Sequence, residues 1–576
     1  SNRRHHLMVD LFVQQYQDGH RVKDTADLRR VLALPRRHLP DWEQTAKELG
    51  AVLRLPKGKM DLRDVQARAL YDLGTVGGLF APMRVGAGKT LVSFLAATVT
   101  FSLRPLLLVP AKLVAKTQRE LVVAMAHWDI VSPRIMTYEW LGRVQGADAL
   151  DKYEPDIIVA DECHKLKNTK AAVTRRVSRW FKQHDETKCV LMSGTMTKRS
   201  IHDYAHMLMW VYGPQDYPLP VTYNEREVWA DALDARKQQR LAHPGALKLF
   251  CNEEETKLWE QQEARTAYRR HLVNTPGVIA TTETPIDSSL TVQSVSPDVS
   301  AKVEHAFFEL RSLWETPDGW PLADGLEMFR HARELALGFY YKWDPRPERS
   351  WLDPRKIWCS FVRKKINNSN RWDSELQVRQ EFPNAPELLD WLAVRDTFTP
   401  NTVPVWIDDF LIPVVEKWAK NNRGIVWVEH RCVGERLEEE TGLTYYGRRG
   451  MSKQGKPIED HPPNQPLIAG SQSNSEGRKR QGWCRNVIVS APPNGAQWEQ
   501  LLGRTHRDGQ EADEVAVDVL MTCSEHVTAF AQAVKDSEYV QDSTGSPQKL
   551  LLADITVLGV EDVMGRQSKR WALRWN

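Results

Sequence analysis

A glycine-rich stretch near residue 85 sets the strictest condition on the fold: Met83-Arg84-Val85-Gly86-Ala87-Gly88-Lys89-Thr90. It follows the apolar run Leu79 to Ala81 and precedes an apolar, helix-like segment, Leu91 to Thr100. A phosphate cradle needs this order of strand, loop and helix, because glycines let backbone N–H groups approach phosphate oxygens and the helix N-terminus adds positive potential. We expect Lys89 to reach the β and γ phosphates and the Thr90 hydroxyl to hold Mg²⁺.

The match to the stricter phosphate-loop motif is incomplete, because Met83 stands where that motif has glycine. A glycine-rich turn that contains Gly-Lys-Thr by chance is the alternative. Upstream, Gln66 lies in Leu62-Arg63-Asp64-Val65-Gln66. Its amide offers a donor and an acceptor together, which the adenine edge of ATP needs. The nucleotide-binding residues predicted here are Gln66, Gly86, Ala87, Gly88, Lys89 and Thr90.

Length and composition narrow the class of protein. At 576 residues the chain is too long for one core, so three or four domains are expected. The net charge is only +3, so nucleic-acid contacts must come from local patches. Seven cysteines lack a Cys-x-x-Cys pair, which argues against zinc and disulfides and favours an intracellular protein. No run of 18 apolar residues is present, so we expect no membrane partner.

Three apolar runs after the loop are separated by helix-length segments: Leu106 to Val109, Ile157 to Ala160 and Cys189 to Met192. Such alternation predicts a doubly wound α/β domain with a parallel sheet. Ligands of these sheets bind at the carboxyl ends of strands, and each run ends in a polar cluster. The clusters are Pro110-Ala111-Lys112, Asp161-Glu162-Cys163-His164 and Ser193-Gly194-Thr195.

Asp161 and Glu162 are the second strong signal, because a buried strand delivers two adjacent carboxylates beside the phosphate loop. We assign Asp161 to Mg²⁺ and Glu162 to the attacking water, which it orients or deprotonates. The alternative is a strand that ends in a solvated acidic turn. His164 is either a surface histidine or a sensor of the nucleotide state.

Six stretches follow one another along the first part of the chain: Arg63-Asp64-Val65-Gln66, Gly86 to Thr90, Leu107 to Leu113, Ile135-Met136-Thr137-Tyr138-Glu139, Asp161 to Asn168 and Ser193-Gly194-Thr195. In this order they resemble the motifs of superfamily-two helicases. Leu166-Lys167-Asn168 after the acidic pair, and the lack of glycine at position 83, resemble the Swi/Snf branch. The resemblance implies two RecA-like lobes, ATP and Mg²⁺ as cofactors, and coupling of hydrolysis to movement through His164, Ser193, Gly194 and Thr195. It also implies DNA contacts at Lys112, Thr137 and Tyr138.

A third signal, Gln500 to Gln510, resembles the last helicase motif, Gln-x-x-Gly-Arg-x-x-Arg, and adds Gln500 to the coupling set. Arg504 and Arg507 are three residues apart, so on a helix they would project from one face. Arginines delivered from a second lobe can neutralise charge on the γ phosphate. We therefore count Lys89, Asp161, Glu162, Arg504 and Arg507 as catalytic. The alternative is a helix with two solvated arginines.

Other apolar runs predict strands of a second lobe: Ile425 to Val428, Leu467 to Ala469, Val487 to Val489 and Val515 to Val519. Leu290 to Val295 alternates like a strand and is expected to begin that lobe. Ser475-Glu476-Gly477 takes the place of a family motif that links DNA to nucleotide, although Arg478-Lys479-Arg480 departs from the usual pattern. The DNA contacts predicted in this lobe are Arg431, Ser475, Gly477 and Arg478.

The expected architecture is an α/β protein with two RecA-like, doubly wound parallel-sheet lobes and helical insertions. Its predicted parts are an N-terminal helical extension (1–58), a first lobe (59–213), a helical protrusion or linker (214–285), a second lobe (286–540) with a helical insertion at about 300–405, and a C-terminal tail or brace (541–576). Tryptophans of the insertion, including Trp320 and Trp343, are expected to be core or interface anchors rather than base-stacking groups.

We therefore expect a compact, monomeric, bacterial or phage-like motor that couples ATP hydrolysis to movement on double-stranded or branched DNA. A strand-separating helicase on DNA or RNA is one alternative. A non-catalytic nucleic-acid-binding scaffold with a relic nucleotide site is the other.

Overall fold

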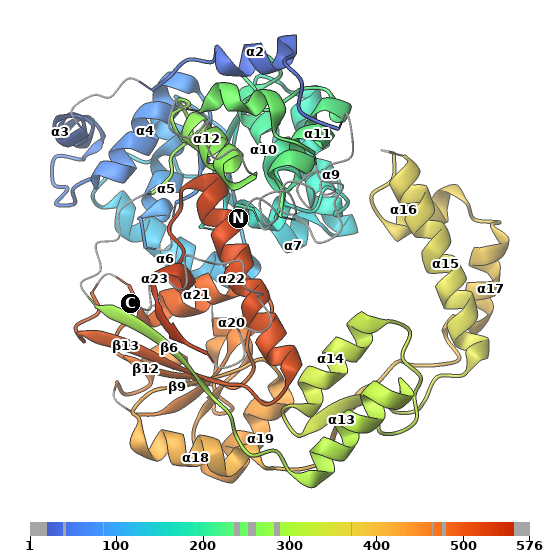
Figure 1. Cartoon of the computed structure of the whole chain (residues 1–576). Coiled ribbons are helices and arrows are strands. Elements are labelled where there is room, and N and C mark those ends of the chain that lie inside the picture. Colours follow the sequence, from blue (N-terminus) through green and yellow to red (C-terminus); the bar gives the residue numbers. More distant parts are fainter. Residues whose placement is uncertain are drawn as a thin grey trace, which may run out of the picture. The chain divides into compact units, whose positions relative to one another are not determined.

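The computed structural model describes residues 20–37, 42–83, 86–194, 196–197, 199–235, 242–251, 261–281, 288–369, 371–463, 465–474, 480–507 and 509–557. The chain divides into two compact units. The first is Ser1–Thr284 with Asp536–Gln548, and the second is Pro285–Lys535 with Lys549–Asn576. Each unit has its own parallel sheet, so the α/β prediction is confirmed. Figure 1 labels these strands of the second unit's sheet: β6 (Ser289–Val295), β9 (Ile425–Val428), β12 (Arg485–Ile488) and β13 (Glu514–Leu520).

The sheet described in the first unit has five strands in the order β1-β5-β4-β2-β3. Every pairing in it is parallel. The strands are β1 (Leu79–Ala81), β2 (Pro105–Val109), β3 (Arg134–Thr137), β4 (Ile157–Asp161) and β5 (Lys188–Met192). The three apolar runs predicted as strands are therefore confirmed as β2, β4 and β5.

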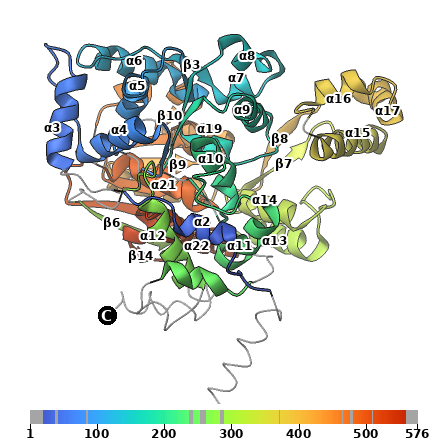
Figure 2. The same cartoon turned by 90° about the horizontal axis from the view of Figure 1, so that it is seen from above.

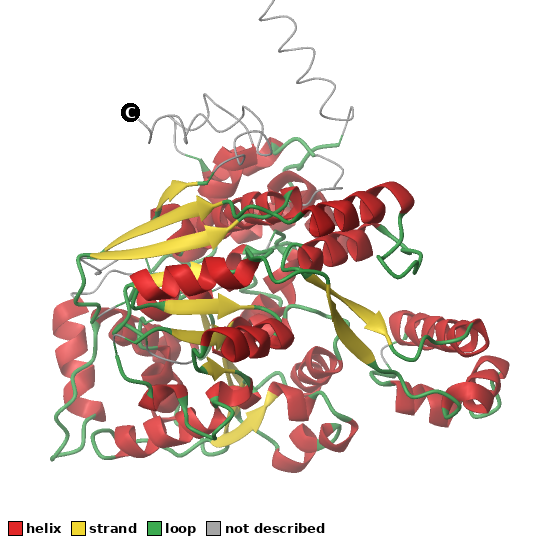
Figure 3. Ribbon diagram, turned by 90° about the horizontal axis from the view of Figure 1, so that it is seen from below, coloured by secondary structure: helices red, strands yellow, loops and turns green. Residues whose placement is uncertain are grey.

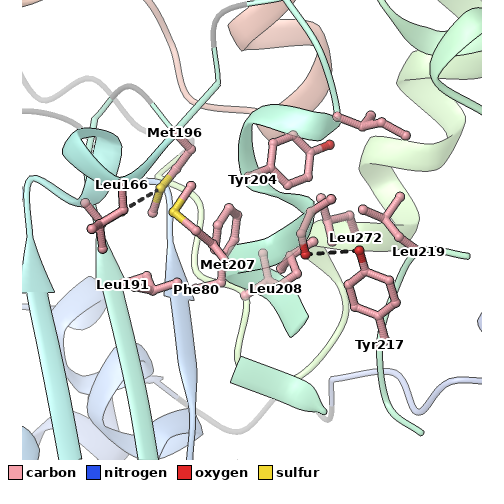
Figure 4. Close-up of a cluster of buried hydrophobic side chains, with 14 of the residues drawn as sticks. Phe80, Leu166, Leu191, Met196, Tyr204, Met207, Leu208, Tyr217, Leu219 and Leu272 are labelled. Atoms are coloured by element: carbon pink, nitrogen blue, oxygen red, sulfur yellow. Dashed lines mark hydrogen bonds between the residues drawn. The ribbon is translucent and has the colours of Figure 1, made fainter. Parts of the chain in front are cut away.

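Strands β1, β2, β4 and β5 are buried on both faces of the sheet, which explains why they are apolar except for Asp161 and Lys188 at strand ends. The edge strand β3, by contrast, begins with the exposed Arg134. Alternate residues point to opposite faces, so Phe80 and Leu191 join one apolar cluster while Ala81 and Val190 join another. Figure 4 shows part of the first cluster, where Phe80 and Leu191 lie with Met207 and Leu208.

Two groups of helices cover the two faces of this sheet. One cluster contains side chains of α3 (Trp42–Leu53), α4 (Asp64–Val76), α5 (Lys89–Val99) and α6 (Val114–Met125). The other contains side chains of α2 (Ala26–Leu32), α7 (Tyr138–Leu141), α8 (Ala149–Tyr153), α9 (Ala172–Gln183), α10 (His202–Tyr212), α11 (Tyr223–Leu233) and α12 (Gln261–Val273).

The sheet described in the second unit has seven parallel strands in the order β10-β11-β9-β12-β13-β6-β14. These are β6 (Ser289–Val295), β9 (Ile425–Val428), β10 (Tyr445–Tyr446), β11 (Leu467–Gly470), β12 (Arg485–Ile488), β13 (Glu514–Leu520) and β14 (Asp554–Thr556). Side chains of α18 (Leu411–Asn421) and α19 (Arg431–Thr441) share a cluster with one face. Side chains of α21 (Gly495–Thr505), α22 (Ser524–Thr544) and α23 (Lys549–Leu552) share a cluster with the other. A short helix, α20 (Ser471–Asn474), follows β11.

The insertion between β6 and β9 contains helices, as expected. It also contains a two-stranded ribbon that the sequence did not predict. Its elements are α13 (Ala301–Leu313), α14 (Gly325–Leu335), β7 (Phe339–Trp343), α15 (Arg349–Asn368), α16 (Glu375–Glu381), α17 (Pro386–Arg395) and β8 (Thr402–Trp406). The ribbon pairs β7 with β8 in antiparallel fashion and leads to α15, α16 and α17 (Figures 2 and 3). Trp351 and Trp358 are buried, as expected of anchoring tryptophans.

Three segments differ from their predicted roles. The helices α11 and α12, expected to protrude, place Trp229 and Leu272 in the core of the first unit. The described part of residues 1–58 also packs into that unit, since Leu28 is fully buried. The predicted tail supplies β14, an edge strand that pairs with β6. None of the described helices has the length and apolar character needed to cross a membrane.

Candidate nucleotide site

The register of the first sheet brings the predicted nucleotide residues to one edge. Ala81, at the end of β1, and Asp161, at the end of β4, both pair with Met192 of the intervening strand β5. Carboxyl ends of β1, β4 and β5 are therefore level. Two strand spacings separate β1 from β4, roughly 10 Å. The loop after β1, the acidic pair and Ser193 thus emerge side by side.

Two glycines give the loop its shape. Gly86 has φ 94° and Gly88 has φ 81°, and Gly88 is the N-cap of α5. A Cβ atom at Gly88 would lie 2.2 Å from Gln66 Nε2, so a larger residue there would displace the Gln66 amide. Gln66 Nε2 donates to the Gly88 carbonyl at 3.0 Å, and its Oε1 accepts from the Arg63 N–H at 2.9 Å. In this structure Gln66 therefore braces the loop, and its contact with adenine stays a prediction.

The Lys89 side chain contacts the segment that precedes α5. Its Nζ donates to the Met83 carbonyl at 3.0 Å, and the side chain is buried. The Met83 side chain is also buried, in the apolar cluster that contains Val92, which explains an apolar residue where the stricter motif has glycine. Arg63 Nη1 donates to the Gly86 carbonyl at 3.0 Å. Sequence reasoning gave Arg63 no role of its own, because nothing local predicts this contact.

Two further loop residues, Ala87 and Thr90, lie near the start of α5. Ala87 is buried, and Thr90 occupies the first turn of α5. A helix N-terminus there supplies N–H groups and positive potential to an anion. Arg84 and Val85 lie outside the described residues.

The acidic pair is held by a sharp turn after β4. Glu162 has φ 57° and ψ 46°, a left-handed conformation that is uncommon for a residue other than glycine. Its N–H donates to Asp161 Oδ1 at 3.1 Å. Enclosure by protein, together with the neighbouring Glu162 carboxylate, raises the pKa of Asp161 to about 6, while Lys89 and Lys116 oppose this shift. The Lys89 ammonium and the Asp161 carboxylate thus interact across the strand edge.

Glu162 belongs to a triangle of side chains with His164 and Ser193. Glu162 Oε2 lies 3.2 Å from His164 Nδ1. The Ser193 hydroxyl donates to the same oxygen at 3.3 Å. The third side, from His164 Nδ1 to Ser193 Oγ, is 3.1 Å. Three residues of the predicted coupling and catalytic sets therefore contact one another. Gly194 is buried beside them, whereas Thr195 lies outside the described residues.

The predicted DNA contacts of the first unit have different surroundings. Lys112 is exposed in the short helix after β2 (Ala111–Leu113). Thr137 is the N-cap of α7, and its hydroxyl accepts from the Trp140 N–H at 3.0 Å. Tyr138 is buried and donates through its hydroxyl to the Asp161 carbonyl at 2.7 Å. Tyr138 therefore supports the acidic turn, a role that the sequence pattern did not reveal.

In the second unit, Arg504 lies in the last turn of α21. Its Nε donates to the Gln500 carbonyl at 2.9 Å, and both side chains are buried. The prediction that Arg504 and Arg507 share a helical face is wrong, because α21 ends at Thr505. His506 is extended, and its Nε2 lies 2.8 Å from the Ser288 carbonyl.

A side chain that follows α21 in the sequence caps the C-terminal end of this helix. Gln510 Nε2 donates to the Thr505 carbonyl at 2.9 Å, which satisfies one of the carbonyls left open at a helix end. Arg507 consequently lies in the turn between the helix and Gln510, whose N–H donates to the Arg507 carbonyl at 3.0 Å.

Of the DNA contacts predicted in the second unit, the structure describes one, Arg431. Arg431 begins α19, is exposed, and donates to Glu435 Oε1 at 2.7 Å. Ser475, Gly477 and Arg478 lie outside the described residues.

The edge of the first sheet has the donor set that a magnesium nucleotide needs. The Thr90 hydroxyl and the Asp161 carboxylate are hard oxygen ligands of the kind Mg²⁺ prefers, and Mg²⁺ commonly takes its other ligands from water and phosphate. Lys89 and the N-terminus of α5 suit the phosphates. No protein-family model matches this chain, and no curated protein matches it either.

Proposed function

We propose that the chain is an ATP-driven motor of the superfamily-two type, with Swi/Snf-like motifs, that moves on double-stranded or branched DNA. One observation carries the proposal furthest. Ala81 and Asp161 are level across β5, so the phosphate loop and the acidic pair share one sheet edge. That edge is where nucleotides bind in parallel α/β sheets.

Each residue of this edge has a task in the proposed reaction. Lys89 and the N–H groups at the start of α5 bind the phosphates, while Thr90 and Asp161 hold Mg²⁺. The metal supplies positive charge that neutralises the phosphate oxygens during transfer. Glu162 orients a water molecule and accepts its proton, and Ser193 and His164 fix the carboxylate of Glu162 through the contacts described above.

We further propose that the two units are RecA-like lobes and that the second completes the site. In this proposal Arg504 and Arg507 reach the γ phosphate when ATP is bound. Arginine suits this task because its guanidinium is always charged and presents several donors. The supporting observation is that both units carry a parallel sheet with helices on both faces.

The test is the ATPase rate measured in parallel without polymer and with single-stranded DNA, duplex DNA, forked DNA and RNA. We expect duplex or forked DNA to stimulate hydrolysis. A triplex-displacement assay beside a strand-separation assay on tailed duplexes then separates a translocase from an unwinding helicase, since a translocase removes the third strand but leaves the duplex paired. Absence of ATPase activity with every polymer would refute the motor.

A further inference from the structure

A cavity of about 390 Å³ lies within the insertion of the second unit. Its walls come from the turn before α14, from α14 itself, from the β7–β8 ribbon and from His430, the N-cap of α19. This volume falls in the range of roughly 300–1,000 Å³ that is usual for small-ligand pockets. His430 lies two residues after Val428, the carboxyl end of β9, so the cavity borders the edge of the second sheet where ligands of parallel sheets bind.

Arg333 fastens the wall formed by α14 to that edge. Its Nη2 lies 2.8 Å from Glu429 Oε2, 3.0 Å from Ser490 Oγ and 2.9 Å from the Ala491 carbonyl. Glu429 follows β9, and Ser490 follows β12. Because this side chain is buried, the cavity is a fixed part of the second unit rather than a gap between loose helices.

The carboxylates of the cavity already accept hydrogen bonds from the protein. Asp318 accepts from Arg346 at 2.8 Å, and Glu334 lies 2.9 Å from His331 Nδ1. Glu327 Oε2 accepts from the Ala323 N–H at 2.8 Å. Within the part of the chain that the structure describes, the Lys342 ammonium, by contrast, has no acceptor. The cavity therefore offers a cation to an anionic group of a guest.

The same cavity has flat aromatic walls and open hydrogen-bonding atoms. Trp320 and Trp343 line it and are only partly buried, so they differ from the core anchors that the sequence predicted. Arg346 lies over the Trp320 ring, 5.2 Å from its centroid, so that this cation stacks as well as pairs. Among the described residues, Glu327 Oε1 and the Thr402 hydroxyl make no hydrogen bond, so they are available to ring N–H and carbonyl groups of a guest.

From this arrangement we propose that the cavity binds one nucleotide, with its base against Trp320 or Trp343 and its phosphate on Lys342. A base has π faces that stack on indole and edges that carry donors and acceptors, and a phosphate supplies the anion. The nucleotide is either part of a nucleic-acid strand or free in solution. This inference deepens the proposed function, because a strand held there would lie at the edge of the second sheet.

The test is nucleotide binding without ATP, in a Lys89→Ala background that weakens the phosphate loop. Fluorescence anisotropy of a dye-labelled, single-stranded oligothymidylate reports the strand. Thymidine monophosphate, titrated directly by calorimetry, reports the free nucleotide. The test variants are Lys342→Gln, Trp320→Leu and Trp343→Leu. Lys417→Gln on the exposed face of α18 and Trp314→Leu, which is outside the cavity, are the matched controls.

We expect the tryptophan variant that removes the stacked ring, Trp320→Leu or Trp343→Leu, to weaken binding of at least one probe by about tenfold, the usual effect of losing a base–aromatic stack. Lys342→Gln should weaken binding of the same probe and lower its salt dependence, because a phosphate contact is lost. Loss on the oligonucleotide assigns the site to a strand, and loss on thymidine monophosphate alone assigns it to a free nucleotide. Thermal melting checks that each variant is folded.

The inference is overturned if all three folded variants bind both probes as tightly as the two controls do. Failure of the proposed motor would appear elsewhere, as absent ATPase activity in the unmodified chain. The two outcomes are therefore distinguishable, since the binding assay uses no ATP.

Discussion

At the scale of single residues, Glu162 shows how backbone and side chain combine at the candidate site. A left-handed conformation at a residue with a side chain costs about 1–3 kcal/mol. The turn is held by the hydrogen bond from the Glu162 N–H to Asp161 Oδ1 and by the contacts of its carboxylate with Ser193 and His164. The chain turns sharply there, so two adjacent carboxylates have different partners and can take different roles.

Replacing Glu162 with glutamine should leave ATP binding in place and lower turnover by about 10²–10⁴, the usual contribution of a general base. Glutamine keeps the shape of the side chain but does not accept a proton at neutral pH. ATPase rates with DNA and titration with a fluorescent ATP analogue measure the two effects. Glu186→Gln, at an exposed carboxylate of the same unit, is the control. Turnover equal to that of the unmodified chain would contradict the role given to Glu162.

At the scale of elements, the start of α5 depends on two separate demands made on Gly88. One is its positive φ, and the other is the close approach of Gln66 Nε2. Gly77, at the end of α4, has nearly the same φ of 82°, but nothing lies within 4 Å of its Cβ position. The two glycines therefore separate backbone strain from steric conflict.

We predict that Gly77→Ala lowers the free energy of unfolding by about 1–2 kcal/mol, the cost of the left-handed conformation. Gly88→Ala should cost more, because the added methyl group also displaces Gln66. Combining Gly88→Ala with Gln66→Ala should recover part of that excess, whereas Gln66→Ala should not relieve Gly77→Ala. Urea unfolding of the four variants and the Gln66→Ala protein measures these differences. Equal costs at both glycines would disprove the steric contribution of Gln66.

The sequence predicted well those elements that depend on local pattern. Apolar runs identified β2, β4 and β5, because a strand buried on both faces is a nearly continuous apolar run that can be recognised in the sequence. The end of α21 was not predictable, since His506 is drawn out of the helix by the Ser288 carbonyl, which is 218 residues away in sequence. The C-terminal tail or brace was predicted to begin at residue 541, yet α22 continues to Thr544 and buries Ser543. Such outcomes depend on long-range packing.

The same distinction applies to the candidate site. The sequence predicted Lys89, Asp161 and Glu162 as candidate residues, because each follows an apolar run that is itself a local pattern. The hydroxyl of Tyr138 reaches the Asp161 carbonyl only because β3 and β4 flank β2 in the sheet. Strand order is a property of the whole sheet, so the supporting role of Tyr138 became visible only with the structure.

At the scale of the whole molecule, each unit buries a histidine that should make its stability depend on pH. Burial lowers the pKa of His271 in the first unit to about 3, with help from Arg36. Burial also lowers the pKa of His526 in the second unit to about 3, with help from Arg333. His526 lies between Ser490 Oγ, at 3.3 Å, and Thr522 Oγ1, at 3.2 Å, which suit a neutral ring.

Below the ordinary histidine pKa of 6.5, the unfolded chain binds protons at these positions while the folded chain does not. The free energy of unfolding should therefore be greatest above pH 6.5 and fall as the pH decreases toward 3. Each histidine contributes a slope of about 1.4 kcal/mol per pH unit.

Chemical denaturation across this pH range, with His271→Gln and His526→Gln, measures this slope. Each variant should be less stable at neutral pH yet lose less stability on acidification, because one proton-binding difference is gone. His305→Gln, at an exposed histidine, should keep the original slope. Unchanged slopes in both buried-site variants would show that neither ring is held neutral by the fold.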